Sequence, residues 1–291
     1  MIEKSGFLNI IKPTGMTSAD VVFAVKKKLK IKKIGHLGTL DPAATGVLPI
    51  AIGKATKFFD YFLNKDKVYV ARVKFGIATD TLDSFGKVIE INNKTTLNEE
   101  ILSVLPSFIG KIFQIPPKYS AIKINGKRAC DLARENIEFE IKPKQIEIYK
   151  IELLQDFGAN EFLFRVHCST GTYIRTLFAD IAEKLGTIST TTAILRQKSG
   201  RFNIDSAIAL EELDISNVIP ILTAFEGCQL VNVNDVAAKK LLNGVSISKN
   251  EISENLQNEF FIRYKNITIG FYKINGDKVE PIVFLNEVGD D

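Results

Sequence analysis

The pattern of apolar residues predicts two buried strands and two helices in the first part of the chain. The strands fall at residues 6–11 and 47–52, where most side chains are apolar. Thr17 or Ser18 can cap a helix that lies between them, and residues 58–62 predict a second, shorter helix. Apolar residues of the first helix recur at every fourth position, as on one helix face: Val21, Val25 and Leu29.

Strand patterns dominate the middle of the chain. Residues 67–76 alternate, with four side chains on one face of the predicted strand: Tyr69, Ala71, Val73 and Phe75. Residues 87–91 are predicted to be the antiparallel partner of this strand, across a connection rich in Thr and Asp. Asn125-Gly126 is the sequence signal of a two-residue hairpin turn. Hairpin-linked strands favour an α+β fold with a mixed, mainly antiparallel sheet over a doubly wound parallel one.

A helix and a change of pattern follow further along. Residues 162–168 alternate again, and Gly171-Thr172 then opens a helix that stops at Gly186. Four apolar residues share one side of this helix: Ile174, Leu177, Ile181 and Leu185. Beyond residues 226–230 lie one more helix and several short strands. We therefore expect one domain over residues 1–228 and a small C-terminal domain over residues 229–291.

Composition limits the chemistry that the protein can perform. Only two histidines, His36 and His167, and three widely spaced cysteines occur in 291 residues. This count disfavours a disulfide framework, a zinc site and any mechanism built on a histidine cluster. Carboxylates, Tyr, Lys and Arg remain as candidate groups. No segment approaches the ~20 apolar residues of a membrane span, and residues 1–6 lack a signal pattern, so a cytoplasmic location without membrane contact is expected.

Four segments hold residues that could carry chemistry, and one of them is Lys67-Val68-Tyr69, where the tyrosine can also be an aromatic that packs on the sheet. Residues 35–46, Gly-His-Leu-Gly-Thr-Leu-Asp-Pro-Ala-Ala-Thr-Gly, place Asp41 in a glycine-rich loop. By itself, such an aspartate more often shapes a turn than reacts. Residues 169–176 bring Tyr173 and Arg175 to a strand–helix junction, although an arginine there can also be an ordinary surface residue. The paired aspartates of residues 79–83 could bind a metal or shape a turn. Net charge is +4, and six lysines crowd residues 26–33.

Four segments together resemble the bacterial tRNA pseudouridine-55 synthases, the TruB family, which is related to the eukaryotic enzyme dyskerin. Residues 35–46 resemble the catalytic motif of that family, and residues 171–176 resemble its Tyr/Arg motif. Residues 12–18 resemble its first motif, and residues 116–126 resemble a block near its RNA-gripping insertion. The matches come in family order and cover roughly residues 5–200.

The resemblance implies an isomerase that converts uridine to pseudouridine in the T-loop of tRNA, at position 55. Asp41 would act at the ribose, either as nucleophile at C1′ or as base at the 2′ position. Arg175 would pair with Asp41 and keep it ionised. Tyr69 would stack on the flipped uracil and accept the C5 proton. Substrate contacts are expected at five further positions: Lys12, His36, Asp80, Tyr173 and Leu195.

The same resemblance implies the remaining organisation. An RNA-gripping insertion is expected at about residues 112–146, and a PUA-like RNA-binding domain is expected at the C-terminus, where the family motifs are weak. The partner is the T-arm of tRNA, with no small-molecule cofactor and no metal, and the protein is expected to be a monomer. Gln197 departs from the Arg-Arg pair expected at residues 196–197, which would alter a phosphate contact and leave the chemistry intact.

Two other functions compete with this one. A non-catalytic RNA-binding module, such as a tRNA chaperone, could use the same fold, although the presence of Asp41, Tyr69 and Arg175 disfavours it. A hydrolase that acts on a nucleoside or sugar would need a second carboxylate, for which Asp80 is the only nearby candidate. Release of free uracil would distinguish this hydrolase from an isomerase.

Overall fold

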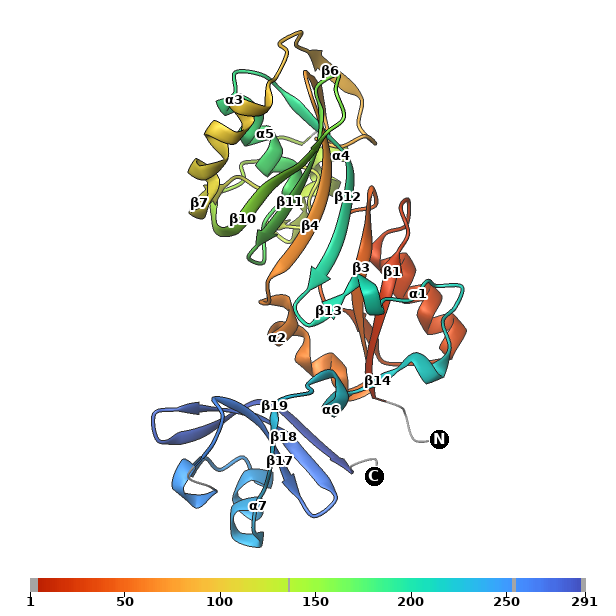
Figure 1. Cartoon of the computed structure of the whole chain (residues 1–291). Coiled ribbons are helices and arrows are strands. Elements are labelled where there is room, and N and C mark those ends of the chain that lie inside the picture. The colour runs from red at the N-terminus through yellow and green to blue at the C-terminus, as the bar shows by residue number, and fades with distance from the viewer. Residues whose placement is uncertain (1–4, 136, 253–254, 289–291) are drawn as a thin grey trace.

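The computed structural model describes residues 5–135, 137–252 and 255–288, and shows an elongated molecule built on two sheets (Figure 1). No signal pattern is expected in residues 1–6, and residues 1–4 of this segment lie outside the described residues. Among the described residues, no helix is long and apolar enough to span a membrane.

In the described part of the chain, ten strands form one large mixed sheet. They are β1 (Gly6–Lys12), β2 (Ile34–His36), β3 (Ala44–Ile52), β4 (Lys67–Phe75), β7 (Gly110–Gln114), β10 (Lys144–Asp156), β11 (Glu161–Cys168), β12 (Ser189–Ser199), β13 (Phe202–Asn203) and β14 (Ile219–Pro220). Their order is β14-β1-β3-β12-β4-β11-β10-β7, with β2 beside β3 and β13 beside β12. Among the described strand pairs of this sheet, only that of β3 with β12 is parallel.

The core lies between this sheet and helix α5 (Ile174–Lys184). On β4 the alternation predicted from the sequence is confirmed, because Ala71, Val73 and Phe75 are buried on one face. All four predicted apolar residues of α5 are buried too, since the helix turns them toward the sheet. The rings of Phe164 on β11 and Phe178 on α5 lie 4.7 Å apart between centroids.

The partner predicted for β4 was wrong. Residues 88–91 form β6 (Val88–Ile91), which pairs with β5 (Ile77–Thr79) in a separate two-stranded sheet. Strand β4 is central, with β11 and β12 on its two edges, so no edge is left for a local hairpin partner. The chain leaves β4 at Gly76, which has φ +87 and meets the backbone of Asn92 so closely that no side chain would fit.

Helices flank the large sheet at several points. Helix α1 (Ser18–Leu29) begins with a capping box at Thr17 and buries Val21 and Val25, as its spacing predicts. The remaining helices of this region are short: the 3₁₀ turn η1 (Gly53–Phe58), α2 (Phe59–Leu63), α3 (Asn98–Val104), and the 3₁₀ turns η2 (Leu105–Phe108), η3 (Ile204–Ser206) and η4 (Ile215–Asn217).

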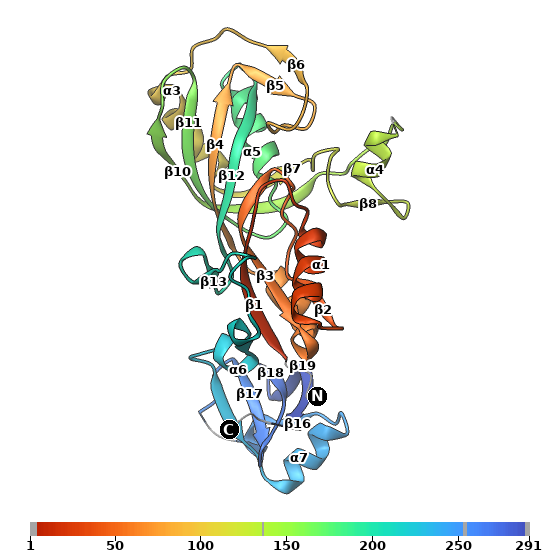
Figure 2. The same cartoon turned by 90° about the vertical axis from the view of Figure 1, so that its right-hand side faces the viewer.

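An insertion between β7 and β10 projects away from the sheet (Figure 2). It contains β8 (Lys123–Ile124), β9 (Lys127–Arg128) and α4 (Ala129–Arg134). The predicted hairpin at Asn125-Gly126 is confirmed, because β8 pairs with β9 and both turn residues have positive φ, 49 and 87.

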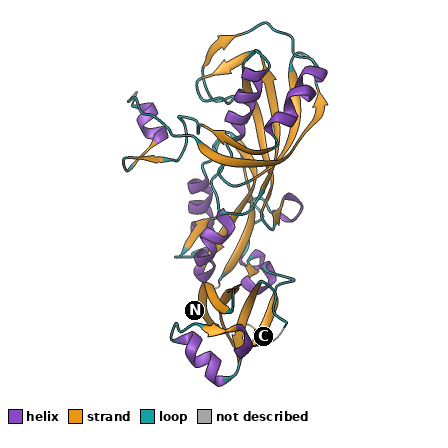
Figure 3. Ribbon diagram, turned by 90° about the vertical axis from the view of Figure 1, so that its left-hand side faces the viewer, coloured by secondary structure: helices purple, strands orange, loops and turns teal. Residues whose placement is uncertain are grey.

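A second, five-stranded sheet follows the large sheet along the chain (Figure 3). Its order is β15-β17-β18-β19-β16, and it is called the C-terminal sheet below. Its elements and their neighbours are α6 (Ile221–Ala224), β15 (Gln229–Asn232), α7 (Asp235–Leu242), β16 (Ile247–Ser248), η5 (Lys249–Glu251), β17 (Glu259–Tyr264), β18 (Ile267–Asn275) and β19 (Lys278–Val288).

Helix α5 should stabilise the fold through its buried face alone. Replacing Ile181, which is fully buried, by Ala should lower the free energy of unfolding by about 2–5 kcal/mol, because a cavity remains in the core. Glu183→Ala, on the exposed face of the same helix, should change it by no more than about 0.5 kcal/mol. Urea denaturation measures both values, and equal effects would contradict this packing.

Candidate active site

The loop between β2 and β3 presents Asp41 to a buried arginine. Asp41 Oδ2 lies 2.6 Å from Arg175 Nη2, at the first turn of α5. The Arg175 side chain is 3% exposed, whereas the Asp41 side chain is 35% exposed. The guanidinium is therefore fixed inside the protein, and the carboxylate that it holds remains accessible from outside.

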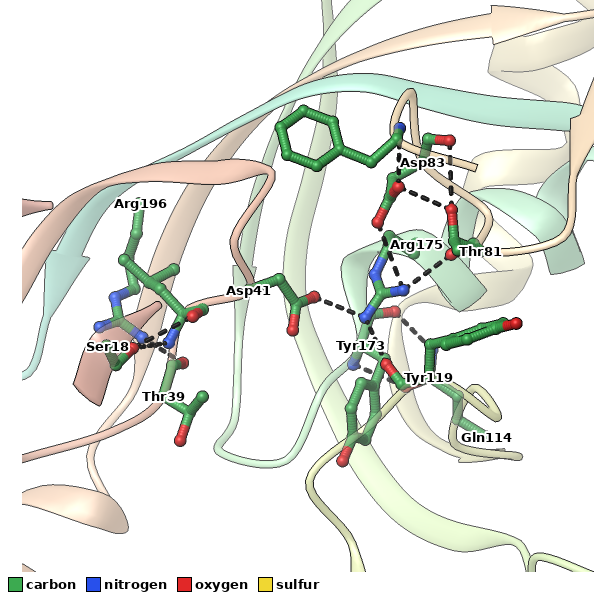
Figure 4. A network of polar contacts seen from close by, with 12 residues as sticks. Ser18, Thr39, Asp41, Thr81, Asp83, Gln114, Tyr119, Tyr173, Arg175 and Arg196 are labelled. Atoms are coloured by element: carbon green, nitrogen blue, oxygen red, sulfur yellow. Dashed lines mark hydrogen bonds and ion pairs between the residues drawn. The ribbon is translucent and has the colours of Figure 1, made fainter. Parts of the chain in front are cut away.

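Arg175 has further partners that fix the direction of its guanidinium (Figure 4). It donates to the carbonyl oxygen of Thr81 at 2.7 Å and to that of Tyr119 at 3.0 Å. Asp83 Oδ2 lies 3.5 Å from its Nη1. Two carboxylates and two backbone carbonyl groups thus surround the planar guanidinium of Arg175. These contacts fix its orientation relative to Asp41.

Asp83 is a site residue that the sequence reasoning missed. It is 6% exposed, and its Oδ1 accepts hydrogen bonds from the Thr81 hydroxyl at 2.7 Å and the Phe85 amide at 3.0 Å. The expected substrate contact, Asp80, is exposed and accepts the Lys87 amide at 2.8 Å, which closes the turn. Both aspartates occur in one turn-rich segment, and no residue pattern there separates their roles.

A second buried arginine holds both ends of the Asp41 loop. Arg196, on β12, is 1% exposed and donates from Nε to the carbonyl oxygen of Val47 at 2.7 Å. Its other nitrogens donate to the carbonyl oxygens of Gly38 and Thr39, each at 3.2 Å. One side chain therefore links the chain before Asp41 to the strand that follows it.

Gly46 makes this arrangement possible. It pairs with Arg196 where β3 and β12 run parallel, and its φ is +105. A Cβ at this position would lie 2.4 Å from the carbonyl oxygen of Arg196. Any other residue would push β12 away and with it the arginine that holds the loop.

Lys12 and Ser18 hold the middle of the same loop. Ser18 Oγ accepts the Leu40 amide at 2.9 Å and donates to the Leu40 carbonyl at 3.1 Å. Lys12 Nζ donates to the carbonyls of Met16 at 2.6 Å and Pro42 at 3.4 Å. Lys12 is fully buried, and this burial lowers its pKa to about 8, against the opposing effect of Asp41. Lys12 therefore supports the backbone of this loop, and its expected contact with the substrate stays a prediction.

A cavity of about 500 Å³ opens above Asp41. Tyr69 of β4 and Tyr173, just before α5, line it, and burial raises the pKa of both phenols. Gln114 fixes the backbone of Tyr173 through a reciprocal pair of hydrogen bonds, at 2.8 and 3.0 Å. The other lining residues come from five places: the Asp41 loop with the start of β3, the turn from α2 into β4, the insertion, the residues before and at the start of α5, and β12. They are Gly38, Thr39, Leu40, Ala44, Leu63, Asn64, Lys67, Ala121, Ile122, Ser169, Thr170, Gly171, Thr172, Ile174, Arg175, Ile194 and Arg196.

Four expected substrate contacts do not line this cavity within the described structure: Lys12, His36, Asp80 and Leu195. Leu195 pairs with Val70 and thus points to the sheet face opposite Tyr69, because side chains alternate along a strand. His36 lies on β2, where burial lowers its pKa and its Nδ1 lacks a hydrogen-bond partner in the described residues. The same residues contain no cluster of three or more His, Cys, Asp or Glu side chains suited to a metal.

Known proteins resemble this chain over nearly its whole length. The family model described as TruB family pseudouridylate synthase (N terminal domain) matches residues 26–174. The tRNA pseudouridine synthase B of Clostridium kluyveri is 44% identical over 277 residues, covering 92% of this chain and 96% of that protein. The protein of the same name from Caldanaerobacter subterraneus is 40% identical and covers 95% of this chain and 97% of its own.

Solved structures show the same fold. A chain from the crystal structure of a Cbf5-Nop10-Gar1 complex matches with a TM-score of 0.71 and 25% identity, covering 98% of this chain and 87% of its own. A chain from an archaeal box H/ACA sRNP Nop10-Cbf5 complex matches with a TM-score of 0.69 and 22% identity, covering 97% and 86%. They confirm the expected class, an α+β pseudouridine synthase fold with a β-rich, PUA-like C-terminal part. By sequence and by fold, the chain belongs to the TruB family of pseudouridylate synthases.

Proposed function

We propose that this protein isomerises uridine to pseudouridine at position 55 in the T-loop of tRNA. The observation that carries the proposal is the accessible Asp41 carboxylate, held 2.6 Å from a buried arginine beneath a cavity of about 500 Å³. Cavities of this size suit small molecules and single nucleotides. The relatives named tRNA pseudouridine synthase B support tRNA as the substrate.

The reaction needs one carboxylate at the ribose. The N1–C1′ bond breaks, the uracil turns, and a C5–C1′ bond forms, while C5 loses a proton and N1 gains one. Asp41 assists either by attacking C1′ or by removing a proton at the 2′ position, and both routes require an ionised carboxylate. No redox step occurs, and neither a metal nor a small-molecule cofactor takes part in the proposed reaction.

Arg175 holds the Asp41 carboxylate in place and aims it at the ribose. Its buried guanidinium forms a short, charge-assisted contact of 2.6 Å with Asp41 Oδ2. Asp83 in turn holds the guanidinium from its other side. Backbone groups hold both the Arg175 guanidinium and the Asp83 carboxylate. Little reorganisation is therefore needed when charge changes at C1′.

The two tyrosines form walls for the uracil. Their raised pKa values keep the phenols protonated at neutral pH, so Tyr69 can take the C5 proton only if its own proton leaves in the same step. Ring stacking on the flipped base does not require that transfer. The main role that we propose for Tyr69 is therefore to stack on the uracil as a wall of the cavity.

The target nucleotide must leave its loop before it can reach Asp41. Unstacking costs a few kcal/mol, which stacking and hydrogen bonds in the cavity offset. The insertion contributes Ala121 and Ile122 to the cavity wall and projects away from the large sheet (Figure 2), and we propose that it contacts the T-arm. In this proposal the protein acts as a monomer, and His36 occupies the space that the everted base leaves.

Asp41→Asn should abolish pseudouridine formation while tRNA binding survives, because the amide is neutral and neither attacks carbon nor removes a proton. Mapping of pseudouridine in unmodified tRNA, together with a filter-binding assay, separates the two properties. Turnover close to that of the wild type would remove Asp41 from its proposed role. Release of free uracil by the wild type would indicate a hydrolase instead.

Asp83→Asn should lower the single-turnover rate by roughly ten- to a hundredfold, since a small shift of the Arg175 guanidinium misplaces Asp41. Asp80→Asn is the matched control, because Asp80 belongs to the same turn and contacts neither residue. It should keep the rate within about twofold of the wild type. Similar losses in both variants would contradict a specific role for Asp83.

Lysines of the last turn of α1 and its C-cap, Lys30, should contribute to tRNA binding through phosphate contacts. Lys26 and Lys30 are exposed, whereas Lys28 Nζ donates to the carbonyls of Leu210 at 3.2 Å and Glu211 at 2.7 Å. Changing Lys26 or Lys30 to Gln should reduce the slope of log K against log salt by roughly 0.7–0.9 for each phosphate that is no longer neutralised. Lys28→Gln should change the slope less, and equal changes for all three would contradict this assignment.

A further inference from the structure

One short helix connects the C-terminal sheet to the wall of the catalytic cavity. Helix α2 has five residues and follows η1 directly. Isolated helices of this length are unstable, so tertiary packing must hold α2 in place. Its surroundings therefore decide where its C-terminal end lies, and that end borders the active site.

The packing side of α2 belongs to an aromatic cluster shared by both sheets. Phe58 and Phe62 are almost completely buried there. Phe271, on β18 of the C-terminal sheet, lies 6.0 Å from Phe58 and 5.4 Å from Tyr61 between ring centroids. Other members of the cluster are Phe7, Phe202, Phe225, Phe261, Val283 and Leu285.

Polar contacts add to this docking. The Tyr61 hydroxyl donates to Glu259 Oε2 at 2.9 Å, and Lys57 Nζ donates to the carbonyl oxygen of Phe284 at 2.7 Å. Residues of η1 and α2 thus contact two strands of the C-terminal sheet, β17 and β19. The C-terminal sheet therefore holds the segment together with the large sheet, whose Phe7 and Phe202 rings lie 5.1 and 5.3 Å from the ring of Phe62 (Figure 1).

The other end of α2 forms part of the cavity wall. Leu63, Asn64 and Lys67 line the cavity. Lys67 is 4% exposed, and its Nζ donates to the carbonyls of Leu63 at 2.6 Å and Lys65 at 2.5 Å, which fixes the turn between α2 and β4. Two residues further along β4 is Tyr69, the proposed stacking wall.

We propose that docking of the C-terminal sheet against α2 holds the Leu63–Lys67 wall in place, with Lys67 as its positioning residue. The C-terminal sheet thereby contributes to the catalytic rate as well as to any contact with RNA. This inference rests on the proposed function, since the rate concerned is that of uridine isomerisation. Contacts that only bind RNA would change affinity and leave the rate at saturation unchanged.

A matched pair of variants tests the coupling. Phe271→Leu alters the ring that faces α2, whereas Phe260→Leu alters a fully buried ring in the separate core between the C-terminal sheet and α7. With a short RNA hairpin that carries only the T-stem and T-loop, single-turnover rates are measured at saturating full-length enzyme. Phe271→Leu should lower the single-turnover rate roughly five- to tenfold, with little change in the enzyme concentration that gives half of the maximal rate. Phe260→Leu should leave the rate within about twofold of the wild type.

Lys67→Met should lower the rate in the same way, and the double variant with Phe271→Leu should lose little more than either single variant, because both act on one wall. Melting temperatures of the two Phe→Leu variants show whether their losses of stability match. Equal rate losses for Phe260→Leu and Phe271→Leu, unchanged rates, or additive effects of Lys67→Met and Phe271→Leu would each overturn the proposal.

Hydrogen exchange tests the same coupling without any turnover. Amides of residues 59–67 should exchange faster in Phe271→Leu than in the wild type, and at the wild-type rate in Phe260→Leu. Unchanged protection of this segment in Phe271→Leu would overturn the inference even if the enzyme is active. Faster exchange in a protein that forms no pseudouridine would instead place the failure in the proposed function.

Discussion

The guanidinium of Arg175 is the constraint on which the catalytic half of this protein depends. Burying an arginine costs several kcal/mol unless its donors are satisfied and its charge is balanced. Here carboxylates and carbonyls from the Asp41 loop, the β5–β6 connection and the insertion satisfy that requirement together. Segments that are distant along the chain must therefore assemble around α5 before the arginine can be buried, which ties formation of the site to formation of the fold.

The Asp41 loop is held by cations as well, but through its carbonyl groups. Lys12 and Arg196 direct positive charge at backbone oxygens on either side of Asp41. This arrangement fixes the loop through its backbone and leaves the Asp41 carboxylate to pair with Arg175. A positive surrounding also suits a substrate whose backbone is a chain of phosphates.

The two sheets share the task of shaping one cavity. The large sheet supplies Tyr69 and Arg196 from adjacent strands, β4 and β12, whose pairing places both side chains on the same face. The aromatic cluster fills the junction between the sheets and packs against α2, whose Leu63 lines the cavity. Aromatic rings suit such a junction, since each buries a large area with few rotatable bonds.

The sequence by itself determined features that depend on local spacing. The buried faces of α1 and α5, the Asn125-Gly126 turn and the motif around Asp41 are visible in it, because helix, strand and turn periodicities are properties of neighbouring residues. Tertiary structure alone decided that β4 pairs with β11 and β12, and that Asp83 holds Arg175 while Asp80 closes a turn. It also decided that Lys12 supports a loop and that Leu195 faces away from the cavity. Strand order and the direction of a side chain depend on contacts between distant segments, and no local pattern encodes them.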